Sequence, residues 1–358
     1  MKMKRYKYIL LSCLLAAFFV SCEVEFSPNA EWKEMPVVYC VLDQDDDTTF
    51  VRVQRCYLGS GNQYEYATIY DSINYREGDI QVKILGWPSL RSAGQVLSVD
   101  PSATAPVKDW VCDYMEIEKS DGAFNATKQP VYFCPTKNQF DTNLVYQLLV
   151  IDTRSGDTIA RATTALLGNP NTNREFITKP SNNSKFQFQG NTGMCELQWF
   201  TLPRARKYQP VVRFYYKDFI LTPNGHGNDT TIIRHSIDIE YGTKSPAVNE
   251  VTQCNRSIDE QTYLSTLRTH LQNDTVHKII IDTVDIYLRC CSEELSNYIY
   301  SHETSSSINQ NRVNYTNVEG GLGIFASRRT HMYVRRITPP NGDSDYKKKI
   351  HKLGVNLW

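Results

Sequence analysis

Short runs of β-branched and aromatic residues, separated by turn residues, recur along this chain of 358 residues and constrain its fold more than any other feature. Runs of this length, bounded by Gly, Pro, Asn and Asp, are typical of β-strands. In the first half they cover 36–42, 48–58, 79–87, 110–117 and 131–134. We therefore predict a mainly β fold.

The clearest unit is the segment 144–167, in which two alternating runs flank a turn from Asp152 to Gly156. Gly156 supplies the positive φ angle that a tight connection requires, so we predict a β-hairpin. Tyr146 stands near the start of its first strand, as in the last strands of immunoglobulin-like sandwiches. The hairpin therefore predicts the end of an N-terminal immunoglobulin-like β-sandwich over 36–167.

A second domain is predicted because the chain is longer than one hydrophobic core usually serves. Residues 168–193 are rich in Asn, Pro, Thr, Ser and Gly, which is typical of a linker. The domain that follows, 194–340, is predicted to be β-rich, and the tail 341–358 is assigned to neither domain. Its expected strands cover 195–200, 210–221, 230–241, 276–289 and 322–337.

Two short helices are expected to interrupt this second set of strands, at 259–271 and 292–304. Tyr263, Leu264, Leu267 and Leu271 would lie on one face of the first helix. Ser292 is a suitable N-cap for the second, and acidic residues follow it in the first turn.

The first 21 residues are typical of an export signal. An apolar run over 9–20 follows a basic start, and Ser21 then precedes Cys22. The run is shorter than the roughly 20 residues that a membrane-spanning helix needs. We predict cleavage before Cys22, a diacylglycerol on its thiol and an acyl chain such as palmitate on its new amino group. A tether over 22–35 would link this membrane anchor to the first domain.

The charge balance argues against a nucleic-acid partner. The whole chain carries 39 basic and 39 acidic residues, and four of the basic ones lie in the signal. The remainder is mildly acidic, whereas nucleic-acid binding requires a basic face that neutralises phosphates. The short basic clusters at 328–329, 335–336 and 347–349 are interpreted as solvated faces.

Eight cysteines remain once the signal is removed and Cys22 is lipidated. They allow up to four disulfides, with a pairing that the sequence does not choose. Most stand in strand-like runs, where a thiol is a small buried apolar group, so both interpretations stay open. The sequence contains no CxxC pair, so neither a zinc site nor a thioredoxin-type site is indicated. The eight are Cys40, Cys56, Cys112, Cys134, Cys195, Cys254, Cys290 and Cys291.

Three features taken in order resemble a known family: the lipoprotein start, the Tyr146-x-Leu-x-Val hairpin with Gly156-Asp-Thr-Ile, and the glycine-rich segment 317–327. Tyr298 and Tyr300 are similar to an aromatic pair of that family. The chain resembles, over most of its mature length, the lipoproteins grouped as domain of unknown function 4249. The resemblance implies a Gram-negative outer-membrane lipoprotein, often encoded near TonB-dependent transporters, with no established catalytic residues.

Two further patterns resemble features of the same bacteria. Glu23 and Glu25 follow the lipidated cysteine like an acidic signal for the cell surface, so the surface is expected rather than the periplasmic face. Six Asp-Thr or Asp-Ser tripeptides are similar to an O-glycosylation sequon, and we expect one or two to be modified, although the same pattern is ordinary turn-into-strand sequence. The acceptor residues are Thr48, Ser72, Thr158, Thr230, Thr275 and Thr283.

No catalytic residue, metal site or cofactor is predicted. The seven histidines are scattered, and no nucleophile elbow or phosphate-binding loop occurs. The glycines at 320–323 are interpreted as a backbone turn. The acidic run 45–47 lacks the spacing of a calcium loop and is interpreted as a solvated hairpin tip. Paired carboxylates for glycoside hydrolysis are defined only in space, so a hydrolase stays open as an alternative.

The segment 59–75 is the one region whose composition suggests ligand contact, through Tyr64, Tyr66, Tyr70 and Tyr75. The alternative is a flap that packs these tyrosines onto the sandwich. We predict a non-catalytic accessory or binding protein of a TonB-dependent nutrient-uptake system, whose partners are the transporter and its associated lipoprotein. A glycan- or peptide-binding module is the alternative, and a hydrolase is the second.

Overall fold

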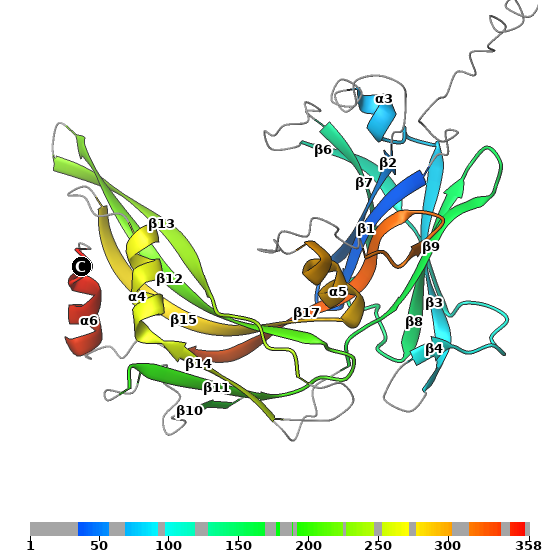
Figure 1. The fold of residues 1–358 in the computed structure, drawn as a ribbon. Helices are drawn as coiled ribbons and strands as arrows, with labels where there is room; N and C mark the ends of the chain where they lie inside the picture. The colour runs from blue at the N-terminus through cyan, green and yellow to red at the C-terminus, as the bar shows by residue number, and fades with distance from the viewer. Residues whose placement is uncertain are drawn as a thin grey trace, which may run out of the picture.

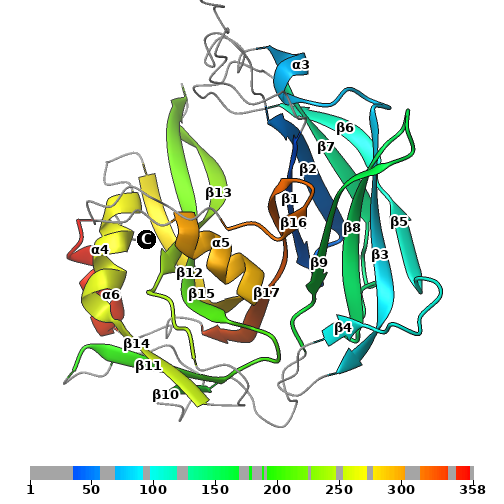
Figure 2. The same ribbon diagram turned by 45° about the vertical axis from the view of Figure 1, so that its right-hand side comes forward.

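The computed structural model is mainly β, as predicted, and consists of two β-rich halves (Figures 1 and 2). It describes residues 35–56, 69–91, 97–118, 128–168, 177–179, 188, 192–224, 227–246, 253–271, 277–302, 315–337 and 344–354. Several predicted features lie outside the described residues: the signal peptide, the lipidation site Cys22, Tyr64, Tyr66, Thr275 and most of the 168–193 linker.

The first half is a sandwich of two facing sheets. One sheet holds β1 (Met35–Asp43), β2 (Thr48–Cys56), β7 (Lys128–Pro135) and β6 (Asp113–Glu118). The other holds β9 (Thr158–Ala165), β8 (Leu144–Asp152) and β3 (Ile80–Arg91), and β4 (Leu97–Val99) and β5 (Lys108–Val111) both pair with β3. Val38 and Val51 from the first sheet and Ile84 and Leu148 from the second are fully buried in one core.

The predicted hairpin is confirmed, because β8 and β9 pair antiparallel around a turn in which Gly156 has a φ of 77°. The strand expected over 110–117 is instead divided into β5 and β6, which belong to different sheets. The chain crosses between the sheets at Cys112, whose N–H donates to the carbonyl of Val82 at 2.9 Å. Alternating composition could not show this break, because both pieces remain extended.

The second half packs a curved sheet against a smaller one and against helices. The curved sheet holds β13 (Gly227–Glu240), β12 (Lys207–Asn224) and β15 (His277–Cys291). The smaller sheet holds β10 (Ile177–Lys179), β11 (Met194–Phe200) and β14 (Gln253–Asp259). Trp199, Phe214 and Ile286 are buried in its core. The strand β14 was not predicted, since its polar side chains give no clear alternation.

Both predicted helices are confirmed, as α4 (Glu260–His270) and α5 (Glu293–His302). Helix α4 begins after Asp259, whose side chain accepts a hydrogen bond from the N–H of Thr262 at 2.6 Å. The tail adds α6 (Ser344–His351), which docks on the same half: Ile350 is fully buried in its core. None of the described helices is long and apolar enough to cross a membrane.

One strand, β17 (Leu322–Ile337), connects the two halves. Its first part, from 322 to 328, pairs parallel with β1, and the rest pairs antiparallel with β15. The preceding β16 (Val318–Glu319) pairs with β9. A single eight-stranded sheet, in the order β13-β12-β15-β17-β1-β2-β7-β6, therefore runs through both halves (Figure 1).

The domain limits expected from the sequence assign the whole of 194–340 to the second half. Residues 318–328 instead complete the first sandwich. Periodicity shows that a segment is a strand and which face it buries, but it does not identify the neighbouring strand.

Three glycines between β16 and β17 allow this close approach. Gly320 has a φ of 77°, which L-residues rarely adopt. A Cβ atom on Gly321 would lie 2.5 Å from the carbonyl oxygen of Pro36, and one on Gly323 would collide with that of Val38. The segment was interpreted as a backbone turn, and the structure adds the reason: the turn must lie directly against β1.

Ion pairs surround the point where β17 passes from one half to the other. Arg328 contacts Asp43 at 3.2 Å and Asp46 at 3.4 Å, and Arg329 contacts Asp45 at 3.2 Å. The interpretation of 328–329 as a solvated face is therefore wrong for Arg329, whose side chain is only 14% exposed. Charges that appear as separate short runs in sequence meet at the junction because β1 and β17 run parallel.

Candidate functional site

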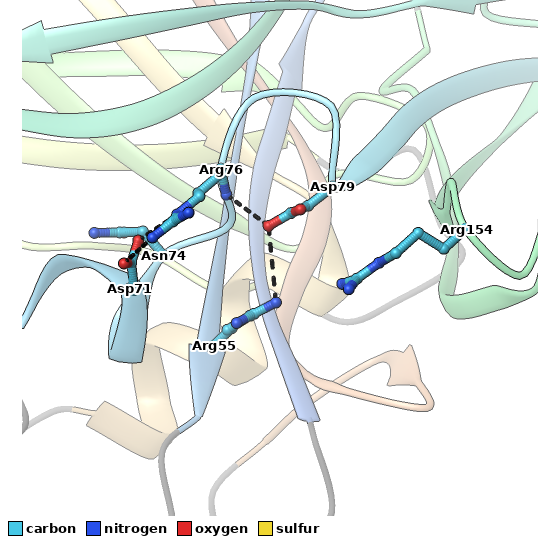
Figure 3. Close-up of a pocket in the computed structure, with 6 residues that line it drawn as sticks. All are labelled: Arg55, Asp71, Asn74, Arg76, Asp79 and Arg154. Atoms are coloured by element: carbon cyan, nitrogen blue, oxygen red, sulfur yellow. Dashed lines mark hydrogen bonds and ion pairs between the residues drawn. The ribbon is translucent and has the colours of Figure 1, made fainter.

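A pocket of about 270 Å³ lies at the end of the first sandwich where β1 begins and β2 ends. Figure 3 shows its charged walls. Six residues line it: Arg55, Asp71, Asn74, Arg76, Asp79 and Arg154. Five of the six carry a charged side chain, three arginines and two aspartates, so the walls of the pocket are strongly polar.

Three separate pieces of backbone bring these side chains together. Arg55 stands near the end of β2, directly opposite Pro36 of β1. Asn74 follows the short helix α3 (Tyr70–Ile73) and forms an isolated β-bridge with Gln54. Arg154 belongs to the turn between β8 and β9 and extends toward the pocket from the opposite side (Figure 3).

The two aspartates hold two of the arginines in place. Arg76 donates two hydrogen bonds to the carboxylate of Asp71. Its Nε donates to Oδ1 at 2.8 Å, and its Nη2 donates to Oδ2. These hydrogen bonds lower the pKa of Asp71 from its ordinary value, so the carboxylate stays ionised at neutral pH. Asp79 accepts a hydrogen bond from the backbone N–H of Arg76 at 3.0 Å and lies 3.9 Å from Arg55.

Arg154 gives the pocket its excess of positive charge. Its side chain is exposed, and within the described ranges it forms no ion pair. The lining therefore holds three arginines and two aspartates, and the carboxylate of Asp152, in the same turn as Arg154, interacts electrostatically with Arg154 and Arg55. A guanidinium in this position offers a planar fork of N–H donors, which matches the two oxygens of a carboxylate or the oxygens of a phosphate.

Asn74 adds an acceptor beside these donors. The residue is 2% exposed, and its Oδ1 has no hydrogen-bond partner among the residues the structure describes. Buried polar atoms are normally satisfied, so an unsatisfied acceptor at the wall of a pocket is a notable exception. The arrangement suits a ligand that carries an anionic group with a hydrogen-bond donor next to it.

The tyrosines expected to contact a ligand do not form one surface. Tyr75 is 1% exposed, and the guanidinium of Arg55 lies over its ring at 4.5 Å. It is therefore a core residue that supports the pocket, not a ligand contact. Tyr70 bonds through its hydroxyl to Glu116 at 3.0 Å and to the hydroxyl of Tyr114 at 3.2 Å. Both side chains contact the sandwich, as in the flap alternative.

The arginines of the pocket were not singled out from the sequence. Arg55 lies in an ordinary alternating strand, Arg76 follows a short helix and Arg154 stands in a hairpin turn. Nothing in the spacing of these three segments indicates that they converge. The one available signal was the composition of 59–75, because Asp71 and Asn74 of that segment line the pocket.

The predicted glycosylation positions differ in their exposure. Thr158 and Thr230 are exposed, at the start of β9 and in β13. The side chains of Thr48, Ser72 and Thr283 are half-buried. Exposure makes the first two the better acceptors for an enzyme that must reach the hydroxyl.

All eight cysteines after the signal are described, and all are thiols in the structure; seven are buried and Cys56 is exposed. Among the described residues no group of three His, Cys, Asp or Glu side chains could hold a metal ion. The acidic run 45–47 is used in ion pairs instead: Asp47 lies 3.0 Å from Lys137, and Asp45 and Asp46 pair with the basic residues of β17.

Comparison with known proteins leaves the family open. No family model matches the chain, and no curated protein sequence matches it. A solved structure described as "Cytokine receptor complex - Crystal form 2" is 9% identical, with 72% of this chain and 92% of that chain covered at a TM-score of 0.19. That score is too low to support an argument. The resemblance to domain of unknown function 4249 stays a prediction.

Proposed function

We propose that this chain is a non-catalytic, lipid-anchored binding protein of the outer membrane, whose first sandwich binds the carboxylate groups of acidic glycans. The observation that carries the proposal is the pocket lined by Arg55, Arg76 and Arg154, into which Arg154 extends from the side opposite Arg76 (Figure 3). The lipidation motif at Cys22 is the basis for the proposed anchor. The arginines of the pocket are the basis for proposing an anionic ligand.

The chemistry of the walls favours acidic sugars. A uronic acid carries a carboxylate and neighbouring hydroxyl groups. The carboxylate would pair with the fork of Arg154, and a hydroxyl would donate to Oδ1 of Asn74 after a rotation of that buried amide toward the pocket. At about 270 Å³ the pocket is at the small end of ligand sites, so it would hold one charged sugar unit of a longer chain.

The tether would keep this pocket near the membrane. Arg55 lies opposite Pro36, which is 14 residues after Cys22. An extended chain of that length spans at most about 50 Å. A glycan held in the pocket would therefore stay close to a transporter in the same membrane, which is the role we propose for the chain beside a TonB-dependent transporter and its associated lipoprotein.

Titration calorimetry with tri-galacturonate tests the ligand class. We expect binding to the wild type and a loss of at least tenfold in affinity for Arg154→Gln, with an unchanged unfolding midpoint because Arg154 is exposed. Arg161→Gln is the matched control, since Arg161 is an exposed arginine of the same sandwich that lies 3.7 Å from Glu319, away from the pocket. No binding by the wild type, or equal effects of both variants, would overturn the acidic-glycan proposal; binding of tri-glutamate alone would replace it with a peptide.

The anchor and the partner are tested in cells. Cys22→Ser should abolish labelling by a fatty-acid analogue and release the chain from the membrane fraction. A tag after Trp358 should recover a TonB-dependent transporter from the membrane extract. Labelling that survives the substitution would exclude the anchor, and an extract without a transporter would exclude the partner while leaving the ligand untouched.

A further inference from the structure

Cys112 and Cys134 are brought opposite each other by the pairing of two strands. Strand β6 pairs antiparallel with β7, and the register sets Asp113 against Phe133. Cys112 directly precedes Asp113 and Cys134 directly follows Phe133, so continuing the register places the two cysteines face to face. The Cα atoms of directly opposed residues are about 4.5–5.5 Å apart, which is within the range of a disulfide.

The side chains of this pair meet inside the core of the first sandwich. Cys134 is 1% exposed and Cys112 is 7% exposed. A hydrogen bond joins the two thiols; it raises the pKa of Cys112 and lowers that of Cys134 from their ordinary value. Of the two sulfurs, that of Cys134 is therefore the one more readily deprotonated, and the thiolate is the nucleophile in disulfide formation.

We propose that Cys112 and Cys134 form a cross-strand disulfide when the chain folds with a disulfide oxidant. The Cys134 thiolate attacks one sulfur of oxidised glutathione, forming a mixed disulfide and releasing one glutathione thiolate. Cys112 then attacks the sulfur of Cys134 and releases the second glutathione. Two protein thiols are oxidised, one glutathione disulfide is reduced, and the two thiol protons end on the two glutathione molecules.

The disulfide would link β7 to the point where the chain crosses from one sheet of the sandwich to the other. Cys112 is the residue at which the chain leaves β5 in one sheet and enters β6 in the other, and its N–H is bonded to Val82 of β3. A disulfide to β7 would fix this crossover and close the segment 112–134. Closing a loop of this length reduces the conformational freedom of the unfolded chain.

The other described cysteines lack this geometry. This holds for the three that the strand order allows to be compared. Cys195 and Cys254 also lie on neighbouring antiparallel strands, but the register sets Cys254 against Trp199 and Cys195 against Ile258, four residues out of step. Cys40 lies on β1, which is separated from β7 by β2, so its backbone is about two strand spacings, or roughly 10 Å, from that of Cys134. These three residues are internal controls for proximity.

Peptide mapping after oxidative refolding tests the proposal without reference to ligand or location. The full chain is unfolded in urea, refolded in reduced and oxidised glutathione, alkylated under denaturing conditions without reduction, and digested. We expect one linked peptide pair containing Cys112 and Cys134, with Cys195 and Cys254 alkylated. Alkylation of both Cys112 and Cys134, or a link from Cys40 to Cys134, would overturn the proposal.

Stability supplies a second readout. Dithiothreitol should lower the urea midpoint of the oxidised wild type and leave that of the Cys112→Ala/Cys134→Ala double variant unchanged. A wild type whose midpoint does not respond to dithiothreitol would contradict the proposed bridge. If the double variant does not fold, Cys195→Ala serves as the comparison, since it removes a buried thiol outside the pair and should retain the response to dithiothreitol.

Discussion

Each half fixes one of its strands, β8 in the first and β12 in the second, with the same device. In the first half the hydroxyl of Tyr146 accepts a hydrogen bond from the N–H of Asp141 at 2.7 Å and donates to its carbonyl at 3.0 Å. In the second, Tyr208 accepts from the N–H of Leu202 at 2.7 Å. Each tyrosine packs beside a tryptophan, with ring centroids 6.2 Å and 5.9 Å apart for Trp110 and Trp199. Both halves thus use a tyrosine corner to hold the turn before a strand.

The halves differ in how they are completed. The second half is covered by α4 and α6, which follow or flank its own strands in the sequence. The first half receives β16 and the start of β17 from residues 318–328, more than 150 residues after β9 ends. Residues 35–168 alone therefore form an incomplete sandwich. The strands that complete its two sheets, β16 and the start of β17, come from residues 318–328.

Among the variants considered, Gly323→Ala should cause the largest loss of stability, because it lies where β17 packs against β1. The residue has a φ of 106°, and an added Cβ would collide with the carbonyl of Val38. We expect a loss of about 3 kcal/mol or more in the free energy of unfolding, because backbone strain and overpacking add. The measurement is the urea midpoint followed by tryptophan fluorescence.

Gly156→Ala is the matched control for that variant. Its φ is 77°, but an added Cβ would have nothing within 4 Å. It should cost only the left-handed backbone strain, about 1–2 kcal/mol. Equal losses for the two glycines would show that β17 does not lie against β1 as described.

Substitution of the two corner tyrosines, Tyr146 and Tyr208, should cause losses of stability of intermediate size and compares the two halves directly. Tyr146→Phe and Tyr208→Phe each leave a backbone N–H without its acceptor, at a cost of about 1–3 kcal/mol. We expect Tyr146→Phe to lose at least as much, because its hydroxyl also donates at 3.0 Å whereas that of Tyr208 reaches the carbonyl of Leu202 only at 3.5 Å. Thermal unfolding of both variants checks the order; no loss in either would remove the shared device.

We expect a pH effect in the second half at the ion pairs that Asp238 forms with Arg213 and Arg289 across the curved sheet. Hydrogen bonds from Arg213, together with the charge of Arg289, lower the pKa of Asp238. A carboxylate with a lowered folded-state pKa stabilises the fold above its ordinary value near 4 and loses this contribution as the pH falls through the folded-state pKa. Asp238→Asn should therefore cost about 1 kcal/mol at pH 7 and lose less stability than the wild type between pH 5 and pH 3.

Urea midpoints at pH 7, 5 and 3 measure this difference. Asp152→Asn is the control, because its carboxylate also has a lowered pKa but owes it to hydrogen bonds from the backbone of its own turn in the first half. If the wild type and the Asp238→Asn variant lose stability in parallel as the pH falls, the ion pairs of Asp238 do not have the stabilising role assigned to them.

Local patterns predicted the elements better than their partners. The hairpin around Gly156, the helix that buries Tyr263 and Leu267, and the long strands of the second half follow from alternation and caps within a few residues. The division at Cys112, the sharing of β17 and the convergence of Arg55 with Arg154 depend on contacts between segments far apart in sequence. No short-range pattern specifies those contacts, so neither the domain limits nor the pocket could be predicted.

The most direct test of the shared sandwich compares two shortened chains. One ends at Gly168. The other continues through a short Gly-Ser linker into residues 315–328, which is feasible because Val318 pairs with Ala162, six residues before the end of the first piece. We predict that the chain ending at Gly168 shows no cooperative urea unfolding, whereas the extended chain unfolds in a single sharp transition. Equal, cooperative unfolding of both chains would contradict the account.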